Sequence, residues 1–420
     1  MWQAQRDDLA TTSLEERADL VLASARLLHV NGQSTEQTIA AAEHLSRALG
    51  LSTVLIPRWG ELQLRAEDGA SRLVTVVDAD PVGIHMGRVS AVMRLIDSVA
   101  SGDLTASAAV SRLRSISRMP PASTWLFTLA AATGAAALSV IFGVRHVSAV
   151  ALIVVSAAAG AVVRRVPALS RENALLPPFC AAFIAGVVGA FATRENLSSA
   201  LRLVAVCPCM VLVPGAHVLN GMLDLAAARV HLGASRLLYA ALVVLAISAG
   251  LLGGLTLLHV TLPVDVPGRS IPLWLDVAAA GAAAAAFTVF FSSELNTAAW
   301  PVGTGMLAHG LRWWMLSRGF GAATGATLAA LTVGLLLTPV ARRWHIPFAA
   351  VGFASVVSLM PGVLLFRMAS GLVQLASTGN TTLDLLRSII ADGITATDIV
   401  LGMALGLVAS KVTVDTVAGL

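Results

Sequence analysis

The chain has 420 residues, of which 56% are hydrophobic and only 12% are charged, and its mean hydropathy is +0.80. A soluble globular protein carries roughly 25% charged residues, so the composition excludes a protein that is soluble along its whole length. The net charge of +4 could suggest a nucleic-acid partner, but the basic residues stand beside apolar segments, as in membrane proteins, and we expect no nucleic acid to bind.

Residues 1–118 differ from the rest, because charged residues recur there every few positions. The apolar spacing and the turn residues predict four helices and three strands in this region. The helices are expected over 14–30, 34–49, 84–100 and 106–116, and the strands over 53–57, 61–66 and 73–77. Asn31-Gly32 is a typical helix stop, and Ser34 with Gln37 three residues later is a typical helix start. We therefore predict a small soluble α/β domain.

The first residues, MWQAQRDDLATTSLEER, contain no apolar core of the signal-peptide type. We therefore expect residues 1–118 to stay in the cytoplasm. With that starting side, the predicted cytoplasmic flanks of the spans carry eleven Arg and Lys residues and the opposite flanks carry seven. This difference favours the same orientation by the positive-inside rule.

From Met119 onward, charged residues are confined to short clusters between apolar runs of roughly 20 residues, the length that crosses a bilayer. This pattern predicts a polytopic α-helical membrane protein with about ten transmembrane helices. The expected spans are 123–143, 147–163, 175–193, 203–222, 236–258, 272–291, 297–315, 320–340, 346–370 and 395–414. The polar stretch 374–393 is expected to include an amphipathic piece at the membrane surface.

Two of the expected spans are broken by a Pro-Gly pair, at Pro214-Gly215 and at Pro361-Gly362, 147 residues apart. Proline removes a backbone donor, and a helix broken at membrane depth is tolerated only where its backbone faces protein or a watery cavity. Paired breaks at matching places in two halves of a chain indicate the binding site of a transporter.

Further positions recur at nearly the same offset. Trp125 and Trp274 open alanine-rich spans 149 residues apart, and Arg164 and Arg312 end spans 148 residues apart. Such recurrence indicates two repeats of five spans each. Because five is odd, the second repeat must enter the membrane from the opposite face, which predicts a 5+5 inverted repeat. The predicted domains are 1–118, 119–265 and 266–420.

Polar residues follow the first break on one helix face. At 100° per residue, His217, Asn220 and Asp224 fall within about 60° of one another. His217 and Asn220 lie at a depth where polar groups usually face the interior of a helix bundle. Asp224 is either part of this face or simply the first residue of the following loop.

The second half offers different chemistry. Arg367 stands six residues after Pro361, and its guanidinium either faces an aqueous pocket or an anion, or snorkels to the interface. Asp398, in the last span, is a candidate proton carrier or an interface residue. Ser358 precedes the second break.

Together these residues predict a site for a carboxylate. The helix N-termini at Gly215 and Gly362 offer unpaired N–H groups, and Arg367 can pair with a carboxylate bidentately. His217 or Asp224 can carry a proton, or Asp224 and Asn220 can bind an ammonium group. The predicted substrate-binding residues are Pro214, Gly215, His217, Asn220, Ser358, Pro361, Gly362 and Arg367, and the predicted proton-coupling residues are Asp224, His217 and Asp398.

No metal or cofactor is expected. Cys207-Pro208-Cys209 followed by His217 lacks an acidic or second His ligand in the same stretch, and the chain has no P-loop, dinucleotide fingerprint or H-E-x-x-H motif. Drive by ATP within this chain is therefore not expected.

Several segments in this order resemble the threonine/serine exporter family, and the resemblance covers most of the chain. They are Asn31-Gly32-Gln33-Ser34-Thr35-Glu36 with Ala48-Leu49-Gly50-Leu51, Val213-Pro214-Gly215 with Asp224-Leu225, Gly233 and Arg236, and Ser358-Leu359-Met360-Pro361-Gly362. The resemblance implies a transporter, not an enzyme, that exports small hydroxy amino acids across a bacterial inner membrane, driven by protons. Both halves are fused here, which suggests a self-sufficient chain, and a homo-oligomer stays open.

Two alternatives remain. A related pair of chains is associated with dicarboxylate export, which would be favoured if Arg367 paired with a second substrate carboxylate. From another class, the N-terminal domain could be a membrane-anchored hydrolase that uses His85 and Ser90, although no nucleophile motif surrounds them.

Overall fold

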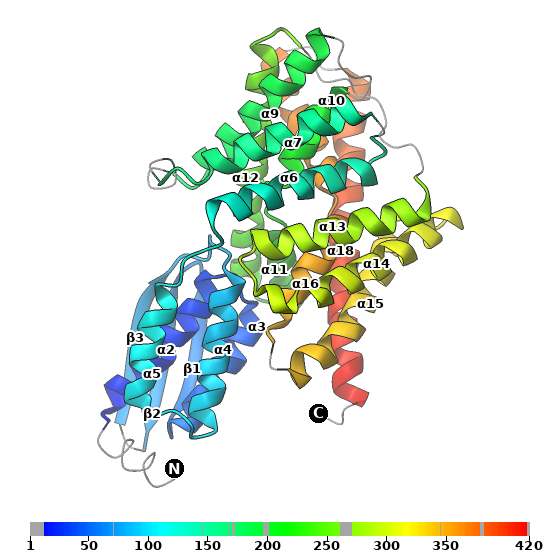
Figure 1. The fold of residues 1–420 in the computed structure, drawn as a ribbon. Helices are drawn as coiled ribbons and strands as arrows, with labels where there is room; N and C mark the ends of the chain where they lie inside the picture. Colours follow the sequence, from blue (N-terminus) through cyan, green and yellow to red (C-terminus); the bar gives the residue numbers. More distant parts are fainter. Residues whose placement is uncertain are drawn as a thin grey trace.

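The computed structural model describes residues 12–417 except 70, 145, 168, 170–172, 196–200, 261–270, 345 and 379–381. Within these residues an α/β unit near the N-terminus lies beside a larger assembly of helices (Figure 1). The predicted boundary between the two membrane repeats, at 265/266, lies outside the described residues.

All seven elements expected in the N-terminal region are present. They are α2 (Leu14–Val30), α3 (Thr35–Ala48), β1 (Ser52–Arg58), β2 (Gly60–Asp68), β3 (Ser71–Ala79), α4 (Met86–Ala100) and α5 (Ala106–Ser117). The strands form an antiparallel sheet in the order β1-β2-β3. As expected, the Ser34 side chain caps α3 by accepting a hydrogen bond from the Gln37 backbone N–H at 3.4 Å.

One face of the sheet is covered by helices. Leu62, Leu64 and Ala66 of β2 are fully buried, and α2 packs against β2 and β3. Because side chains alternate between the faces of a strand, this burial fixes the register of the meander. The apolar residues of the α/β unit are continuous with the buried apolar residues of the helical assembly.

Within the described residues, the remaining α-helices form two sets of six that follow each other along the chain. The first set is α6 (Thr124–Ile141), α7 (Val147–Val163), α9 (Leu176–Arg194), α10 (Leu201–Met210), α11 (Gly215–Ala226) and α12 (Val230–Thr256). The second is α13 (Leu273–Phe290), α14 (Ala299–Ser317), α15 (Ala322–Arg343), α16 (Phe348–Val356), α17 (Gly362–Thr378) and α18 (Leu383–Val417), with the 3₁₀ turns η1 (Leu295–Thr297) and η2 (Val357–Leu359).

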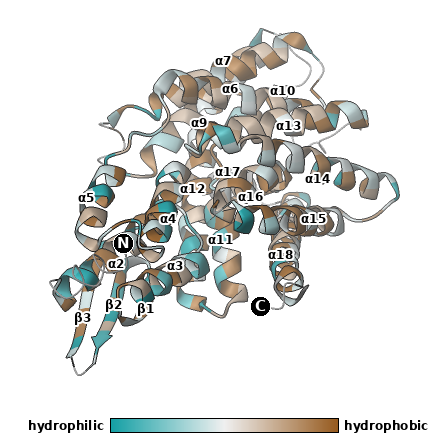
Figure 2. Ribbon diagram, turned by 60° about the horizontal axis from the view of Figure 1, so that its bottom comes forward, coloured by the Kyte–Doolittle hydropathy of each residue, from teal (hydrophilic) through white to brown (hydrophobic). Residues whose placement is uncertain are grey.

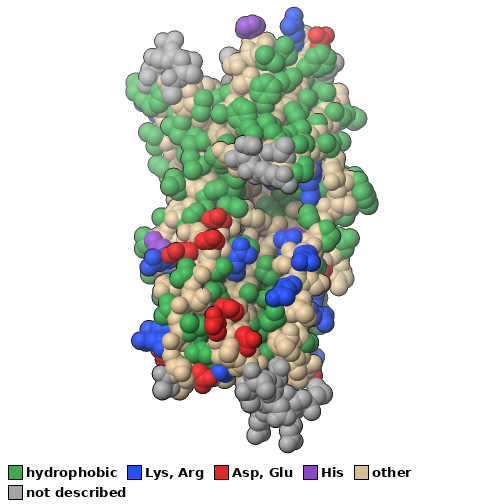
Figure 3. Space-filling model, turned by 90° about the vertical axis from the view of Figure 1, so that its left-hand side faces the viewer, with side chains coloured by type: hydrophobic (Ala, Val, Ile, Leu, Met, Phe, Trp, Pro, Cys, Tyr) green, Lys and Arg blue, Asp and Glu red, His purple; other side chains and the backbone are tan. Residues whose placement is uncertain are grey.

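Six of the described helices, α6, α9, α12, α13, α15 and α18, are long and apolar enough to cross a membrane. Two bent pairs, α10 with α11 at 59° and α16 with α17 at 65°, raise the number to eight if each pair is one span. The hydropathy and charge patterns agree: the helical assembly is largely hydrophobic, and charged side chains gather over the N-terminal unit (Figures 2 and 3). The chain is therefore a polytopic helical membrane protein.

Both Pro-Gly breaks predicted from the sequence interrupt helices, and they lie in the two bent pairs. Eight of the ten predicted spans thus have a counterpart among the six long helices and the two bent pairs. The two that remain, 147–163 and 297–315, correspond to α7 and α14, which are helical but are not among these candidates. α7 has 17 residues, fewer than the roughly 20 that span a bilayer without tilt or thinning.

The two sets of helices pack alike. In the first set α7 contacts α6, α9 and α10, and α12 packs along α9. In the second set α14 contacts α13, α15 and α16, and α18 packs along α15. The sets join through α6 with α13, α11 with α18, and α12 with α17.

The stretch 374–393, which is expected to include an amphipathic piece at the membrane surface, contributes to the end of α17 and to the start of α18. α17 continues to Thr378, and α18 begins at Leu383, where the Thr382 hydroxyl accepts a hydrogen bond from the Leu385 backbone N–H at 3.2 Å. The first turns of α18 pack on α17 because Gly371 leaves room for Ile389, whose Cγ1 lies 2.6 Å from where a Cβ on Gly371 would stand. The expected tenth span therefore belongs to a longer helix.

The contact between α9 and α12 depends on glycine. A Cβ on Gly254 would lie 2.3 Å from the Phe183 carbonyl oxygen, and such a backbone clash forces the helices apart. We expect Gly254→Ala to lower the free energy of unfolding by about 1–3 kcal/mol and to lower the Tm of the detergent-solubilised protein. Gly303→Ala is the control, because a Cβ added at Gly303 would have none of the described atoms within 4 Å. Equal Tm values for the two variants would contradict this account.

Candidate functional site: a buried charge cluster beside a cavity

A cavity of about 720 Å³ lies between the N-terminal unit and the helical assembly. We call it the interface cavity. It is lined by α3 and α4 on one side and by α11, α15, α16 and α18 on the other. Its wall carries charged side chains of both signs: Glu36, Asp97, Asp224, Arg229, Arg342 and Lys411. Two residues predicted from the sequence, Asn220 and Asp224, are in this wall.

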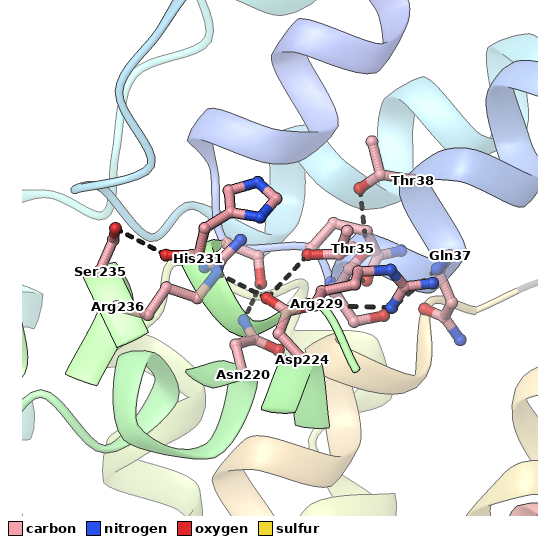
Figure 4. Close-up of polar contacts among 12 residues, drawn as sticks. Thr35, Gln37, Thr38, Asn220, Asp224, Arg229, His231, Ser235 and Arg236 are labelled. Carbon is pink, nitrogen blue, oxygen red and sulfur yellow. Dashed lines mark hydrogen bonds and ion pairs between the residues drawn. The ribbon is translucent and has the colours of Figure 1, made fainter. Parts of the chain in front are cut away.

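Asp224 is the centre of a buried charge cluster (Figure 4). One of its carboxylate oxygens, Oδ2, lies 3.0 Å from Arg236 Nε and accepts a hydrogen bond from the Thr35 hydroxyl at 3.0 Å. Its other oxygen, Oδ1, lies 3.6 Å from Arg229 Nη1. The side chains of Asp224 and Arg236 are 3% and 1% exposed, so both charges are removed from water and depend on each other.

The turn between α11 and α12 builds this cluster. Ala228 has a φ of 57°, and the Arg229 backbone N–H donates to the Asp224 carbonyl at 2.8 Å, which reverses the chain. The first turns of α12 then return past the end of α11, which places Arg236 beside Asp224. Gly233 permits this approach, because a Cβ there would lie 2.8 Å from the Gly221 carbonyl oxygen.

The segment that joins α2 to α3 completes the site from the other side. The Asn220 side-chain amide donates to the Gly32 carbonyl at 3.2 Å, while its Oδ1 is buried and makes no hydrogen bond to the described residues. The same holds for Gln33 Nε2, Gln37 Oε1 and Arg236 Nη2. Buried polar groups normally find partners, so these donors and acceptors give this region hydrogen-bonding capacity for a polar ligand.

The two Pro-Gly breaks meet each other. A Cβ on Gly215 would lie 3.5 Å from Val357 Cγ2, and a Cβ on Gly362 would lie 3.5 Å from Val213 Cγ2. The junction is tightly packed, with a cavity of only about 10 Å³ among residues that include Gly215 and Met360. In this conformation the breaks form a closed apolar contact rather than an open pocket.

Other predicted site residues lie elsewhere. His217 is buried against Tyr239, with 5.1 Å between the ring centroids. Arg367 forms an ion pair with Asp392 of α18, with Nε 3.0 Å from Oδ2. Asp398 is exposed on α18 and makes no ion pair to the other described residues. Of the predicted residues, the interface cavity therefore brings together only Asn220 and Asp224.

Sequence reasoning missed several polar contacts. Asp392 lies in the stretch 374–393, which is expected to include a surface piece, and its contact with Arg367 is not predicted from the sequence. A second buried chain joins Asp276, His309 and Ser358, with 3.3 Å between His309 Nδ1 and Asp276 Oδ2 and 3.0 Å between His309 Nε2 and Ser358 Oγ. The signal was available, because Asp276 and His309 are isolated ionisable residues in apolar runs, and such residues mark function by default.

Burial disfavours the charged form of two histidines of the N-terminal unit, His29 and His85, by lowering the pKa of each. Burial and, to a smaller extent, the nearby charge of Arg236 together lower the pKa of His29 to about 3. Burial also lowers the pKa of His85, whose Nδ1 accepts from the Arg88 N–H at 3.2 Å and whose Nε2 lies 3.1 Å from the Pro120 carbonyl. Both ring nitrogens of His85 thus serve helix capping and packing, which does not suit the general base of a hydrolase.

The N-terminal unit is tied to both sets of helices. Besides the contacts to α11, the backbone N–H groups of Met86 and Gly87 donate to the carbonyls of Phe291 and Ser292, each at 2.9 Å. Gly87 allows this approach, since a Cβ there would lie 2.9 Å from the Ser292 oxygen. A movement of one helix set against the other would therefore act on the N-terminal unit through these contacts.

The chain is similar to known transporters along most of its length. The family described as "Putative threonine/serine exporter" matches residues 19–258, and the family described as "Threonine/Serine exporter, ThrE" matches residues 276–413. A probable threonine/serine exporter of Mycobacterium tuberculosis is 23% identical over 416 aligned positions, which cover 90% of this chain and 75% of the relative. No solved structure matches.

Proposed function

The chain belongs to the threonine/serine exporter family, and on that premise we propose that it exports threonine or serine across the inner membrane in exchange for protons. The observation that carries the proposal is the interface cavity with the Asp224 cluster in its wall. In this proposal residues 1–118 form a soluble cytoplasmic domain, and the cavity receives substrate from the cytoplasm.

The cavity suits a small zwitterion. Its volume of about 720 Å³ falls within the roughly 300–1,000 Å³ typical of small-molecule sites. The charged side chains of its wall include three acidic residues (Glu36, Asp97 and Asp224) and three basic ones (Arg229, Arg342 and Lys411). In this structure Lys411 pairs with Glu36, and Arg229 lies beside Asp224; if these partners exchange, such a wall can bind the ammonium and the carboxylate of one amino acid at the same time.

Asn220 and Asp224 are the residues that we propose bind the substrate ammonium. They stand in the wall of the cavity, and the unpaired Asn220 Oδ1 is an acceptor for an N–H donor. Beyond them the remaining predicted residues would form the path and its gate: Pro214, Gly215, His217, Ser358, Pro361, Gly362 and Arg367. The closed junction of the two breaks is then the barrier that must open toward the far side.

The contacts at the breaks support an inverted repeat. Gly215 faces Val357 and Met360, and Gly362 faces Val213 and Met210. The partners of Gly362 stand 147 residues before the partners of Gly215, so the contact is reciprocal, as a two-fold axis requires. We therefore keep the proposal of ten spans in two inverted repeats of five, 119–265 and 266–420, that rock against each other.

Dicarboxylate export is the less favoured alternative. It would need Arg367 to be available for a second substrate carboxylate, but its guanidinium is paired with Asp392. A dianion would also meet as many acidic as basic groups in the wall of the interface cavity. Both observations favour a zwitterion.

The test is efflux from proteoliposomes loaded with labelled serine, threonine or succinate. We expect serine and threonine to leave faster than from protein-free liposomes, and faster still when the outside is more acidic, because protons then enter in exchange. Asn220→Leu should reduce this efflux at least tenfold. Ser235→Ala is the control, because that exposed hydroxyl donates only to the His231 carbonyl of its own helix. Succinate efflux that exceeds serine efflux would overturn the proposal.

A further inference from the structure

A second polar cluster lies inside the helical assembly, away from the wall of the interface cavity. It runs from Asp276 on α13 through His309 on α14 to Ser358 on η2. The three residues are 4%, 0% and 6% exposed. A hydrogen-bonded chain buried this deeply among apolar helices is costly and usually serves a function.

Both ring nitrogens of His309 are engaged. Nδ1 lies 3.3 Å from Asp276 Oδ2, which holds the imidazole in the tautomer with a proton on Nδ1. Nε2 lies 3.0 Å from the Ser358 hydroxyl, so the neutral ring accepts that O–H. Asp276 thus orients the ring and can stabilise an added positive charge, while Nε2 is the position that gains or loses a proton.

Few other charges face this group. α14 packs against α13, α15, α16, η1 and the neighbouring η2 segment. Within these elements the ionisable residues are Asp276, His309 and Arg312, apart from Arg342 and Arg343 at the far end of α15. Arg312 is one helical turn beyond His309 and interacts electrostatically with Asp276. The local charge is therefore set by three residues.

At the equivalent positions of the first half, the described residues form no such cluster. The residue 149 positions before Asp276 is Phe127, and the guanidinium of Arg164 lies 5.8 Å from the centre of its ring. The residue 149 positions before His309 is Gly160. The positions that carry Asp276 and His309 in the second half are thus occupied by residues without titratable groups in the first half.

We propose that His309 is the proton-binding group of the exporter, with Asp276 as its positioning residue and Ser358 as its link to the second Pro-Gly break. The inference rests on the proposed proton-coupled export. When the site is open to the outside, a proton from water forms an N–H bond at Nε2. When the site opens to the cytoplasm, the same bond breaks and the proton returns to water, with no electron transfer.

The hydrogen bond between His309 and Ser358 links protonation of His309 to the second Pro-Gly break, because its direction depends on the proton. Neutral His309 accepts from the Ser358 hydroxyl, but imidazolium donates from Nε2, so the hydroxyl hydrogen must turn away. Ser358 is two residues before Met360, which packs against Gly215 at the closed junction. Protonation therefore changes a contact beside the gate, which is what coupling requires.

The experiment separates coupling from transport. Proteoliposomes are assayed for net serine efflux with an acidic exterior and for exchange of internal labelled serine against external serine at equal pH. His309→Gln is expected to keep exchange within about twofold and to lose the stimulation by the pH gradient. Asp276→Asn is expected to shift the pH midpoint of net efflux downward, because imidazolium loses its carboxylate.

Thr288→Ala is the matched control, since that buried hydroxyl donates only to the Ala284 carbonyl of its own helix. Full stimulation by the gradient in His309→Gln, or loss of exchange together with net efflux in the folded protein, would overturn the inference. If His309→Gln does not fold, Ser358→Ala replaces it: an unchanged pH profile would overturn the inference, and a shifted one would support it. Absence of serine transport by the parent protein would instead defeat the proposed function.

Discussion

Asp224→Ala is expected to abolish serine efflux and to destabilise the protein. The substitution leaves Arg236, whose side chain is 1% exposed, as an uncompensated buried charge. Breaking a buried pair in this way costs about 3–5 kcal/mol. It also removes the acceptor of the Thr35 hydroxyl, which joins α3 to α11. Tm in detergent and efflux from proteoliposomes are the two measurements.

A double variant separates the structural role of the pair from its role in transport. Replacing both members of a buried ion pair by apolar residues is often neutral or stabilising. We therefore expect Asp224→Ala with Arg236→Met to recover Tm but not efflux. Asp384→Ala is the control, because Asp384 and its partner Arg387 are 93% and 79% exposed and such pairs contribute at most about 1 kcal/mol. Recovery of efflux in the double variant would show that the pair only supports the fold.

A crosslink between the two breaks is expected to stop transport completely. With Cys180, Cys207 and Cys209 replaced, Gly215→Cys and Val357→Cys place one thiol on each side of the closed junction, where a Cβ on Gly215 would lie 3.5 Å from Val357 Cγ2. A cysteine sulfur at position 357 can take the γ position that Val357 Cγ2 now holds, on the side facing residue 215, so oxidation is expected to join the two segments. If the halves must separate here, serine efflux should fall to background after oxidation and return after reduction.

A second cysteine pair controls for oxidation itself. Val54 and Arg65 are paired across β1 and β2, which belong to one sheet, so a disulfide between cysteines at these positions should leave efflux unchanged. Full transport by the protein crosslinked at Gly215 and Val357 would exclude the junction as a moving gate.

Much of the fold follows from local signals. Helical spacing and a helix stop located α2 over Leu14–Val30, and short β-like runs separated by turn residues located the three strands. Proline and glycine located both helix breaks, because their effects on the backbone act within a turn. The polar residues of the stretch 374–393 indicate a surface position, but they could not show that Ile389 packs against α17 in the room left by Gly371, because that contact joins two different helices.

The sequence by itself determined the membrane class, the α/β unit near the N-terminus, the paired breaks and the polar face of α11, since each depends on composition or on neighbours within one helix. Only the tertiary structure decided the partners. It joined Thr35 to Asp224, Arg367 to Asp392, and His309 to Asp276 and Ser358. Periodicity shows which side of a helix faces inward, but the group it meets there depends on how helices distant in sequence pack together.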